Sequence, residues 1–384
     1  MRRLSVSSKH GGSEGSGGGG GGGWALPGDS GIEWVGGSLL AVEGDLSLNL
    51  PTRPFVGLDG PGAVPALKVH SSELASVALE PFDAKQRWFY ERLARLRVPW
   101  HGGHQEVHVR RGNVLADSVR ELSARSPEQF RQTWRFKFSG EPGIDGGGLA
   151  REWWEAVIAA VFAPSSGLFV ATATDSLAFN IDAASAEAMA HPERAFRFVG
   201  RLLGKALLDK QAVGAYLCRP LFKHTLGLPV GLGDLAAVDE ALHGTLAWLL
   251  AHDGVEALEC YFAVDEVVGG KLRTRELVPG GGDERVIDAN KERFVRLRWH
   301  DALLSKPGFG AALAALLRGL YEVVPLPLLT VFDAGELELM LCGVPDIDVA
   351  DWREHTTYAG GCEWRGALVC VCGVPGACAA KVEE

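Results

Sequence analysis

The stretch WRFKFSGEPGIDGGGLAREWW, residues 134–154, places an acidic, glycine-rich turn between a strand-like segment and a long helical segment. A turn of this kind can hold nucleotide phosphates. A Walker-type loop, however, needs a Gly-Lys-Ser/Thr ending to bind phosphate and magnesium, and Gly147, Gly148 and Leu149 stand in that place. We therefore set the nucleotide interpretation aside and predict a strand, a turn and a helix.

Amphipathic helices are predicted within this stretch and on both sides of it. The helix that starts near Leu149 ends where Pro164 would break it. A helix over 82–96 has Asp83 available as a cap, and one over 195–208 has glycines at 200 and 204 that leave room for a close neighbour. Their apolar faces consist of Leu149, Trp153, Val157 and Val161; Phe82, Phe89, Leu93 and Leu96; and Phe198, Leu202 and Ala206.

Short strand-like pieces alternate with these helices. They are WRFKF at 134–138, GLFVATA at 167–173 and CYFAV at 260–264. No unit of roughly 20 to 50 residues repeats along the chain, which excludes a solenoid. The predicted fold class is α+β and mostly helical.

Composition limits the possible partners and the compartment. The 384 residues carry a formal net charge of −10, whereas proteins that bind nucleic-acid backbones need clustered Lys and Arg. We therefore expect no nucleic-acid partner. No apolar run reaches the roughly 18 uninterrupted residues that cross a bilayer, so we expect no membrane insertion. Seven cysteines without a framework spacing, and no secretory signal, indicate reduced thiols and a cytoplasmic location.

The N-terminal part of the chain differs in composition from the rest. Residues 1–23 end in a glycine- and serine-rich tract that cannot bury enough apolar surface to offset its chain entropy, and we interpret 1–23 as a disordered leader. Residues 24–81 contain scattered proline and glycine without a sustained period. This second region is expected to be poorly ordered or weakly folded, with regular structure from residue 82.

Residues 134–154 are similar to the GxDxGGxxREW signature of HECT-type ubiquitin-protein ligases, and the resemblance continues in order along the chain. Six more blocks match that family at plausible spacing, and their order makes the resemblance specific. They are FVGRLLGKALLDKQAVGAYLCRPLFKHTLG (198–227), LECYFAVDE (258–266), ELVPGG (276–281), NKERFVRL (290–297), VVPLPLLTVFDAGELELMLCG (323–343) and DIDVADWREHTTYAGG (346–361).

The resemblance implies a HECT N-terminal lobe over 82–343, with a large helical subdomain and a small strand-containing subdomain built mainly from about 234–281. In that family the small subdomain docks a ubiquitin-conjugating enzyme. The matching positions are Leu258, Tyr261, Phe262 and Leu272, of which Phe262 and Leu258 fit a place in the core equally well. Several members also hold a second ubiquitin through an aromatic residue of an N-x-x-x-x-S-[YF] stretch, where NVLADSVRE has the small aliphatic Val119.

The family's catalytic cysteine has no match in this chain. A HECT ligase takes ubiquitin as a thioester on the cysteine of an HTCF-like motif and passes it to a substrate lysine, which requires neither ATP nor metal. Here the two His-Thr pairs, His224–Thr225 and His355–Thr356, are followed by Leu226 and Thr357. We expect 344–384 to be a truncated or divergent start of the C-terminal lobe, without a catalytic residue.

The seven cysteines also lack a metal-binding pattern. The last four, at 362, 370, 372 and 378, lack the paired knuckles of a zinc site, and Cys218, Cys260 and Cys342 lie in apolar surroundings typical of packed thiols. No histidine pair has the spacing of a metal hydrolase. We expect no metal site and no cofactor.

Two functions fit these observations. The first is a ubiquitin-protein transferase, with a ubiquitin-conjugating enzyme, ubiquitin and a protein substrate as partners, whose catalytic segment is missing from this chain. The second is a non-catalytic module that binds a ubiquitin-conjugating enzyme or acts as an adaptor.

Overall fold

The computed structural model describes residues 23–25, 33–35, 71–141, 147–185, 191–268 and 271–343. The chain divides into two compact units, Met1–Gly343 and Val344–Glu384, and the described residues all belong to the first unit. The predicted C-terminal region, with its four cysteines, lies outside the described residues, as does the predicted leader apart from Gly23.

The strand and the helix predicted from 134–154 are confirmed, whereas the turn predicted between them falls largely on residues 142–146, outside the described residues. Strand β4 (Thr133–Phe138) pairs in parallel with β3 (His104–Val109), and helix α5 (Gly148–Phe162) comes next among the described elements. Alternate side chains of β4 are buried, and the ring of Phe136 stacks on that of Trp153 at 4.2 Å. The Trp153 indole donates to Ser118 Oγ in α3 (Val114–Ser123) at 3.0 Å, so α5 is fixed both by packing and by a buried hydrogen bond.

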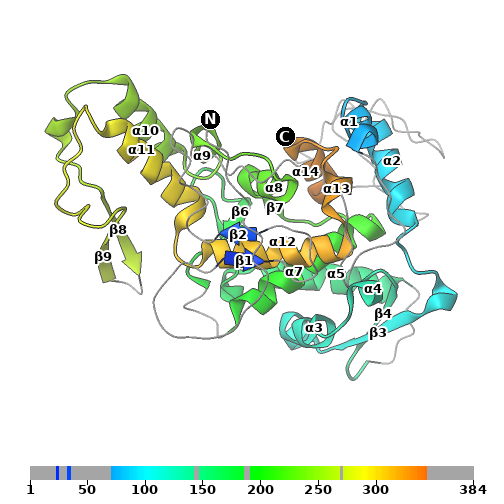
Figure 1. The fold of residues 1–384 in the computed structure, drawn as a ribbon. Helices are drawn as coiled ribbons and strands as arrows, with labels where there is room; N and C mark the ends of the chain where they lie inside the picture. Colours follow the sequence, from blue (N-terminus) through cyan, green and yellow to red (C-terminus); the bar gives the residue numbers. More distant parts are fainter. Residues whose placement is uncertain are drawn as a thin grey trace, which may run out of the picture. The chain divides into compact units, whose positions relative to one another are not determined.

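Helices α7 (Pro192–Asp209) and α12 (Phe309–Val323) form the centre of the main hydrophobic core and lie side by side (Figure 1). A Cβ added at Gly200 would lie 1.8 Å from the carbonyl oxygen of Leu316, and one added at Gly319 would lie 2.0 Å from that of Arg197. The backbones can approach this closely only because these positions lack side chains. The predicted close neighbour of the 195–208 helix is therefore α12.

Regular structure begins before Phe82. Helix α1 (Ser71–Ala78) falls within the stretch expected to be poorly ordered, and it packs against α2 (Phe82–Ala94). The carboxylate of Glu73 in α1 accepts hydrogen bonds from Trp88 and Arg92 in α2, which no sequence period indicates. Asp83 is not a cap, because Pro81 holds that position without a side-chain hydrogen bond.

The remaining elements outside the second hydrophobic core are small sheets and mostly short helices. Strands β1 and β2 pair antiparallel, as do β5 and β6, and β7 joins β6 in parallel. Their bounds are β1 Gly23–Ala25, β2 Glu33–Val35, η1 Trp100–Gly102, η2 Arg111–Asn113, α4 Pro127–Phe130, η3 Pro164–Ser166, β5 Phe169–Ala171, β6 Ala178–Ile181, β7 Tyr216–Leu217, α8 Arg219–Leu226, α13 Leu326–Leu329 and α14 Ala334–Cys342.

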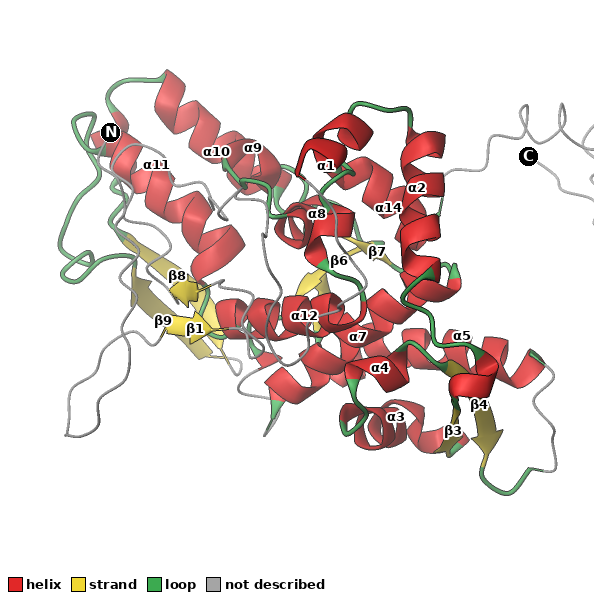
Figure 2. Cartoon of the chain, turned by 45° about the vertical axis from the view of Figure 1, so that its right-hand side comes forward, coloured by secondary structure: helices red, strands yellow, loops and turns green. Residues whose placement is uncertain are grey.

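A second hydrophobic core is formed by residues between Val230 and Leu303. It combines α9 (Leu232–Leu235), α10 (Glu240–Ala251), η4 (Val255–Leu258), α11 (Lys291–His300) and η5 (Asp301–Ser305). The antiparallel hairpin β8–β9 (Ala263–Val268 and Lys271–Glu276; Figure 2) follows Phe262, which is buried in this core, but contributes no described residue of its own to it. This core extends beyond the predicted range of about 234–281, because Phe294, Val295 and Trp299 of α11 are buried in it. The fold is thus mostly helical with small sheets, as predicted for an α+β protein.

Candidate functional site

The four residues predicted to contact a partner lie in or near the β8–β9 hairpin, and the structure separates them by exposure. Leu258, Tyr261 and Leu272 are 48%, 43% and 70% exposed, whereas Phe262 is fully buried. A fully buried ring cannot be a surface anchor in this conformation. Phe262 instead supports the exposed residues from beneath.

The register of the hairpin explains this division. Leu272 is paired with Val267, Thr274 with Asp265 and Glu276 with Ala263, so these positions share one face of the two strands. Counting back by two along the chain places Tyr261 on the same face and Phe262 on the opposite one. The predicted strand CYFAV is accordingly only partly correct, because β8 begins at Ala263 and Tyr261 forms an isolated bridge with Arg285.

The inner side of the hairpin is attached to the second core by packing and by charge. The Phe262 ring meets that of Phe294 edge to face at 5.4 Å. Arg275 donates to Glu266 in the paired strand at 3.2 Å and to the buried carboxylate of Asp301 at 2.9 Å. The hydrogen bond to Asp301 is the main cause that raises the pKa of Arg275. The base of the hairpin is therefore held to the second core at Phe262 and Arg275.

The exposed apolar side chains are spread along the hairpin. Leu272 is paired with Val267, which comes six residues after Tyr261. At a strand rise of about 3.3 Å per residue, Tyr261 and Leu272 are therefore roughly 20 Å apart along the hairpin. Leu258 ends η4, three residues before Tyr261. An interface that touches both ends would have the length of an ordinary protein–protein contact.

Ile287 belongs to this surface and was not predicted. The Phe262 amide donates to Glu284 O at 3.0 Å and the Val286 amide to Cys260 O at 2.8 Å, which brings the distant segment 284–287 beside the start of the hairpin. Ile287 is 41% exposed there. Val286 and Ile287 are both apolar, so the sequence does not indicate which of the two side chains faces the solvent. The backbone pairing of this segment with the start of the hairpin decides that.

Charged groups surround the apolar positions. The Arg285 guanidinium donates to Glu256 O at 2.6 Å and lies 3.7 Å from the Glu259 carboxylate. Nearby, hydrogen bonds from the Gly254 and Val255 amides lower the pKa of Asp288 and fix the start of η4. The surface thus combines apolar anchors with a charged rim, the usual anatomy of a protein interface.

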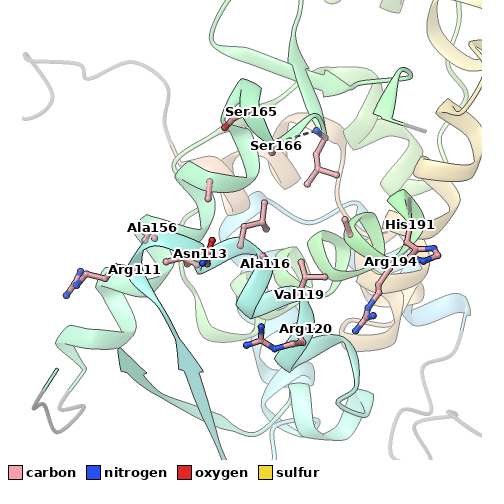
Figure 3. Close-up of a pocket in the computed structure, with 16 residues that line it drawn as sticks. Arg111, Asn113, Ala116, Val119, Arg120, Ala156, Ser165, Ser166, His191 and Arg194 are labelled. Carbon is pink, nitrogen blue, oxygen red and sulfur yellow. Dashed lines mark hydrogen bonds between the residues drawn. The ribbon is translucent and has the colours of Figure 1, made fainter. Parts of the chain in front are cut away.

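A separate hollow of about 670 Å³ lies beside α3, and Val119 lines it (Figure 3). Figure 3 also shows Arg120 of α3 and Arg194 of α7 at the same hollow. Asp117, a buried residue of α3 itself, accepts hydrogen bonds from Arg110 and Arg120, and the bond from Arg110 contributes most to lowering its pKa. Val119 therefore stands on a firmly held helix but offers only a small aliphatic contact.

The described cysteines and metal-binding groups show no catalytic arrangement. Burial raises the pKa values of Cys218 and Cys342 to about 12, which keeps both thiols protonated at neutral pH. Cys260 is half-buried and adjoins Tyr261. Within the described ranges, no group of three or more His, Cys, Asp or Glu could hold a metal ion.

The fold defines a large helical lobe with a small strand-containing subdomain. A family model described as HECT-domain (ubiquitin-transferase) matches residues 155–368, more than half of the chain. The chain therefore belongs to the HECT family, as its motifs predicted. The match begins directly after the 134–154 stretch, which lies outside it.

Curated relatives agree with this assignment. The chain is 35% identical over 300 residues to human E3 ubiquitin-protein ligase HECW1, covering 77% of this chain and 18% of that protein. It is 34% identical over 283 residues to E3 ubiquitin-protein ligase Nedd-4 of Drosophila melanogaster, covering 72% of this chain and 27% of the relative. The chain thus spans about a fifth to a quarter of the length of these relatives. None of its described helices is both long and apolar enough to cross a membrane.

Proposed function

We propose that this chain is the docking unit of a HECT-type ubiquitin ligase and binds a ubiquitin-conjugating enzyme through the exposed face of the β8–β9 hairpin. The observation that carries the proposal is the position of the exposed Tyr261 and Leu272 on one face of the hairpin, with the exposed Leu258 and Ile287 near its base. Exposed apolar side chains that gather on one surface mark interaction sites, whereas single ones are ordinary. Phe262 is assigned a supporting role.

Titration of an isotope-labelled ubiquitin-conjugating enzyme with the full chain tests this docking. We expect localised chemical-shift changes with the unaltered chain. A Tyr261→Ala and Leu272→Ala double variant should bind more than tenfold more weakly, because truncating each interface anchor commonly costs over 1 kcal/mol.

The matched control is a Leu79→Ala and Leu177→Ala double variant. Both residues are exposed, at 88% and 69%, and both lie outside the second core, so the variant removes two exposed apolar side chains without changing the hairpin. Its affinity should equal that of the unaltered chain. Equal binding by the two double variants would remove the hairpin face from the interface.

Transfer of ubiquitin by these 384 residues alone is not part of the proposed function. The chain contains no His-Thr-Cys sequence, and burial keeps the thiols of Cys218 and Cys342 protonated. We infer that ubiquitin and a protein substrate are partners of the ligase to which this docking unit belongs, and that it acts in the cytoplasm. The adaptor role remains the second proposal, since docking is common to both.

A further inference from the structure

A cavity of about 320 Å³ beside α7 is lined by four arginines. Arg194, Arg197 and Arg201 come from α7 and Arg318 from α12, while Ser123, at the end of α3, completes one side. Among the described residues that line it, Glu193 is the only one with a carboxylate. This wall is strongly basic in a chain whose net charge is −10.

The positive charge of this wall is only partly neutralised. Glu322 binds both Arg197 and Arg201, so one carboxylate serves two guanidinium groups. Burial is the main cause of the lowered pKa values of Arg201 and Arg318, and the neighbouring charge of Arg197 lowers both further. Like charges packed this closely raise the free energy of the empty cavity, and an anion between them would lower it.

The donors of the cavity divide into fixed and available ones. Arg201 is fixed, because it is only 3% exposed and donates to Glu322, to Ser123 O at 3.3 Å and to Arg125 O at 2.8 Å. The side chain of Arg194 is exposed and forms no hydrogen bond or ion pair with any described residue. The buried Ser123 hydroxyl likewise has no hydrogen-bond partner in the described part of the chain.

From this geometry we propose that the cavity binds a phosphate monoester carried by a small soluble molecule. Guanidinium groups match the oxygens of a phosphate in pairs, and a buried hydroxyl without a partner is a donor ready for another. The volume lies at the lower end of the roughly 300–1,000 Å³ typical of ligand sites, which favours a small ligand. Arg194 also lines the larger hollow of Figure 3, which leaves room for the rest of the molecule. This site is independent of the docking surface.

Calorimetric titration of the full chain with inorganic phosphate and with glycerol 3-phosphate, at constant ionic strength, tests the proposal. Both should bind, and acetate should bind far more weakly. Arg194→Gln should weaken glycerol 3-phosphate binding about tenfold, and Ser123→Ala by a smaller factor of about threefold. Arg87→Gln removes the same charge from an exposed position of α2 and should leave the affinity unchanged.

Several outcomes would overturn the proposal. One is the absence of binding by either phosphate, and another is an equal loss in Arg194→Gln and Arg87→Gln, which would indicate only general charge attraction. Unchanged affinity in both Arg194→Gln and Ser123→Ala would place any binding elsewhere. A phosphoserine peptide that binds more than tenfold tighter than glycerol 3-phosphate would overturn the assignment to a small molecule. Arg194 is exposed, so its variant should keep the thermal unfolding temperature of the unaltered chain.

Discussion

Tyr261 and Phe262 are neighbours in the sequence with opposite surroundings. Tyr261 is 43% exposed on the outer face of the hairpin, whereas Phe262 is fully buried against Phe294. In the sequence CYFAV every residue is apolar or aromatic, so the alternation that normally separates the two faces of a strand is missing. The family resemblance therefore predicted these positions, but residue type could not assign them to the inside or the outside.

This division predicts different costs for neighbouring substitutions. Phe262→Ala should lower the free energy of unfolding by about 3–5 kcal/mol, because it leaves a cavity in the second core. Leu272→Ala, on the exposed face, should change it by less than about 0.5 kcal/mol. Denaturant unfolding of the two variants measures the difference. A loss below about 1 kcal/mol for Phe262→Ala would contradict its supporting role.

Two buried histidines predict a loss of stability in acid. Burial lowers the pKa of His224 to about 3 and that of His300 to about 4, well below the ordinary value of 6.5. Between pH 6.5 and these values the unfolded chain binds protons that the folded chain does not, so stability falls as the pH falls through this window. His224→Phe removes one such group.

The unfolding free energy should fall between pH 7 and pH 4.5 by about 2 kcal/mol more in the unaltered chain than in His224→Phe. The comparison concerns the change with pH, so a constant packing effect of the new ring cancels. Denaturant unfolding at both pH values measures it. An identical pH dependence in the two proteins would show that His224 does not stay neutral in the folded state.

At the scale of elements, the contact between α7 and α12 depends on glycine. Gly200→Ala would place a methyl group 1.8 Å from a backbone oxygen of α12, so the helices must separate. We expect a loss of about 2–3 kcal/mol of unfolding free energy, even though alanine is the better helix former. Thermal or denaturant unfolding checks this value.

Gly310→Ala is the matched control for the helix contact. Gly310 lies in α12, and a Cβ built there meets no atom within 4 Å, so alanine should stabilise the protein by up to about 1 kcal/mol. Opposite signs for the two substitutions are the expected result. A neutral or stabilising effect of Gly200→Ala would show that the contact is loose.

The sequence predicted the helices themselves better than it predicted which elements they pack against. The spacing of Gly200 and Gly204 correctly indicated a close neighbour but could not identify α12, which lies more than 100 residues later in the chain. The block at 290–297, which overlaps α11, matched the family, but the sequence did not assign it to the small subdomain. In the structure Phe294 and Trp299 of α11 are buried in the second core. Both cases depend on contacts between distant segments, which local periodicity does not contain.

At the scale of the whole molecule, the order of the motifs along the chain predicted the family and the fold class. The sequence did not predict which charged side chains are buried in the core. Lys205 is 1% exposed and donates to Gln132 O at 2.7 Å and to Asp209 at 2.9 Å, and burial lowers its pKa. On the sequence it is an ordinary polar residue of an amphipathic helix. Helix α1 was missed for a similar reason, since Glu73 bonds to side chains of the next helix.

The central proposal is that this chain docks a ubiquitin-conjugating enzyme but does not accept its ubiquitin. The most direct measurement charges a promiscuous conjugating enzyme with ubiquitin, adds the 384-residue chain and resolves the mixture on a non-reducing gel. Because no cysteine follows the His355–Thr356 pair, we expect no thiol-sensitive adduct between ubiquitin and the chain. An adduct that forms and then disappears in Cys378→Ala or Cys372→Ala would contradict the account and reveal an active site in the C-terminal segment.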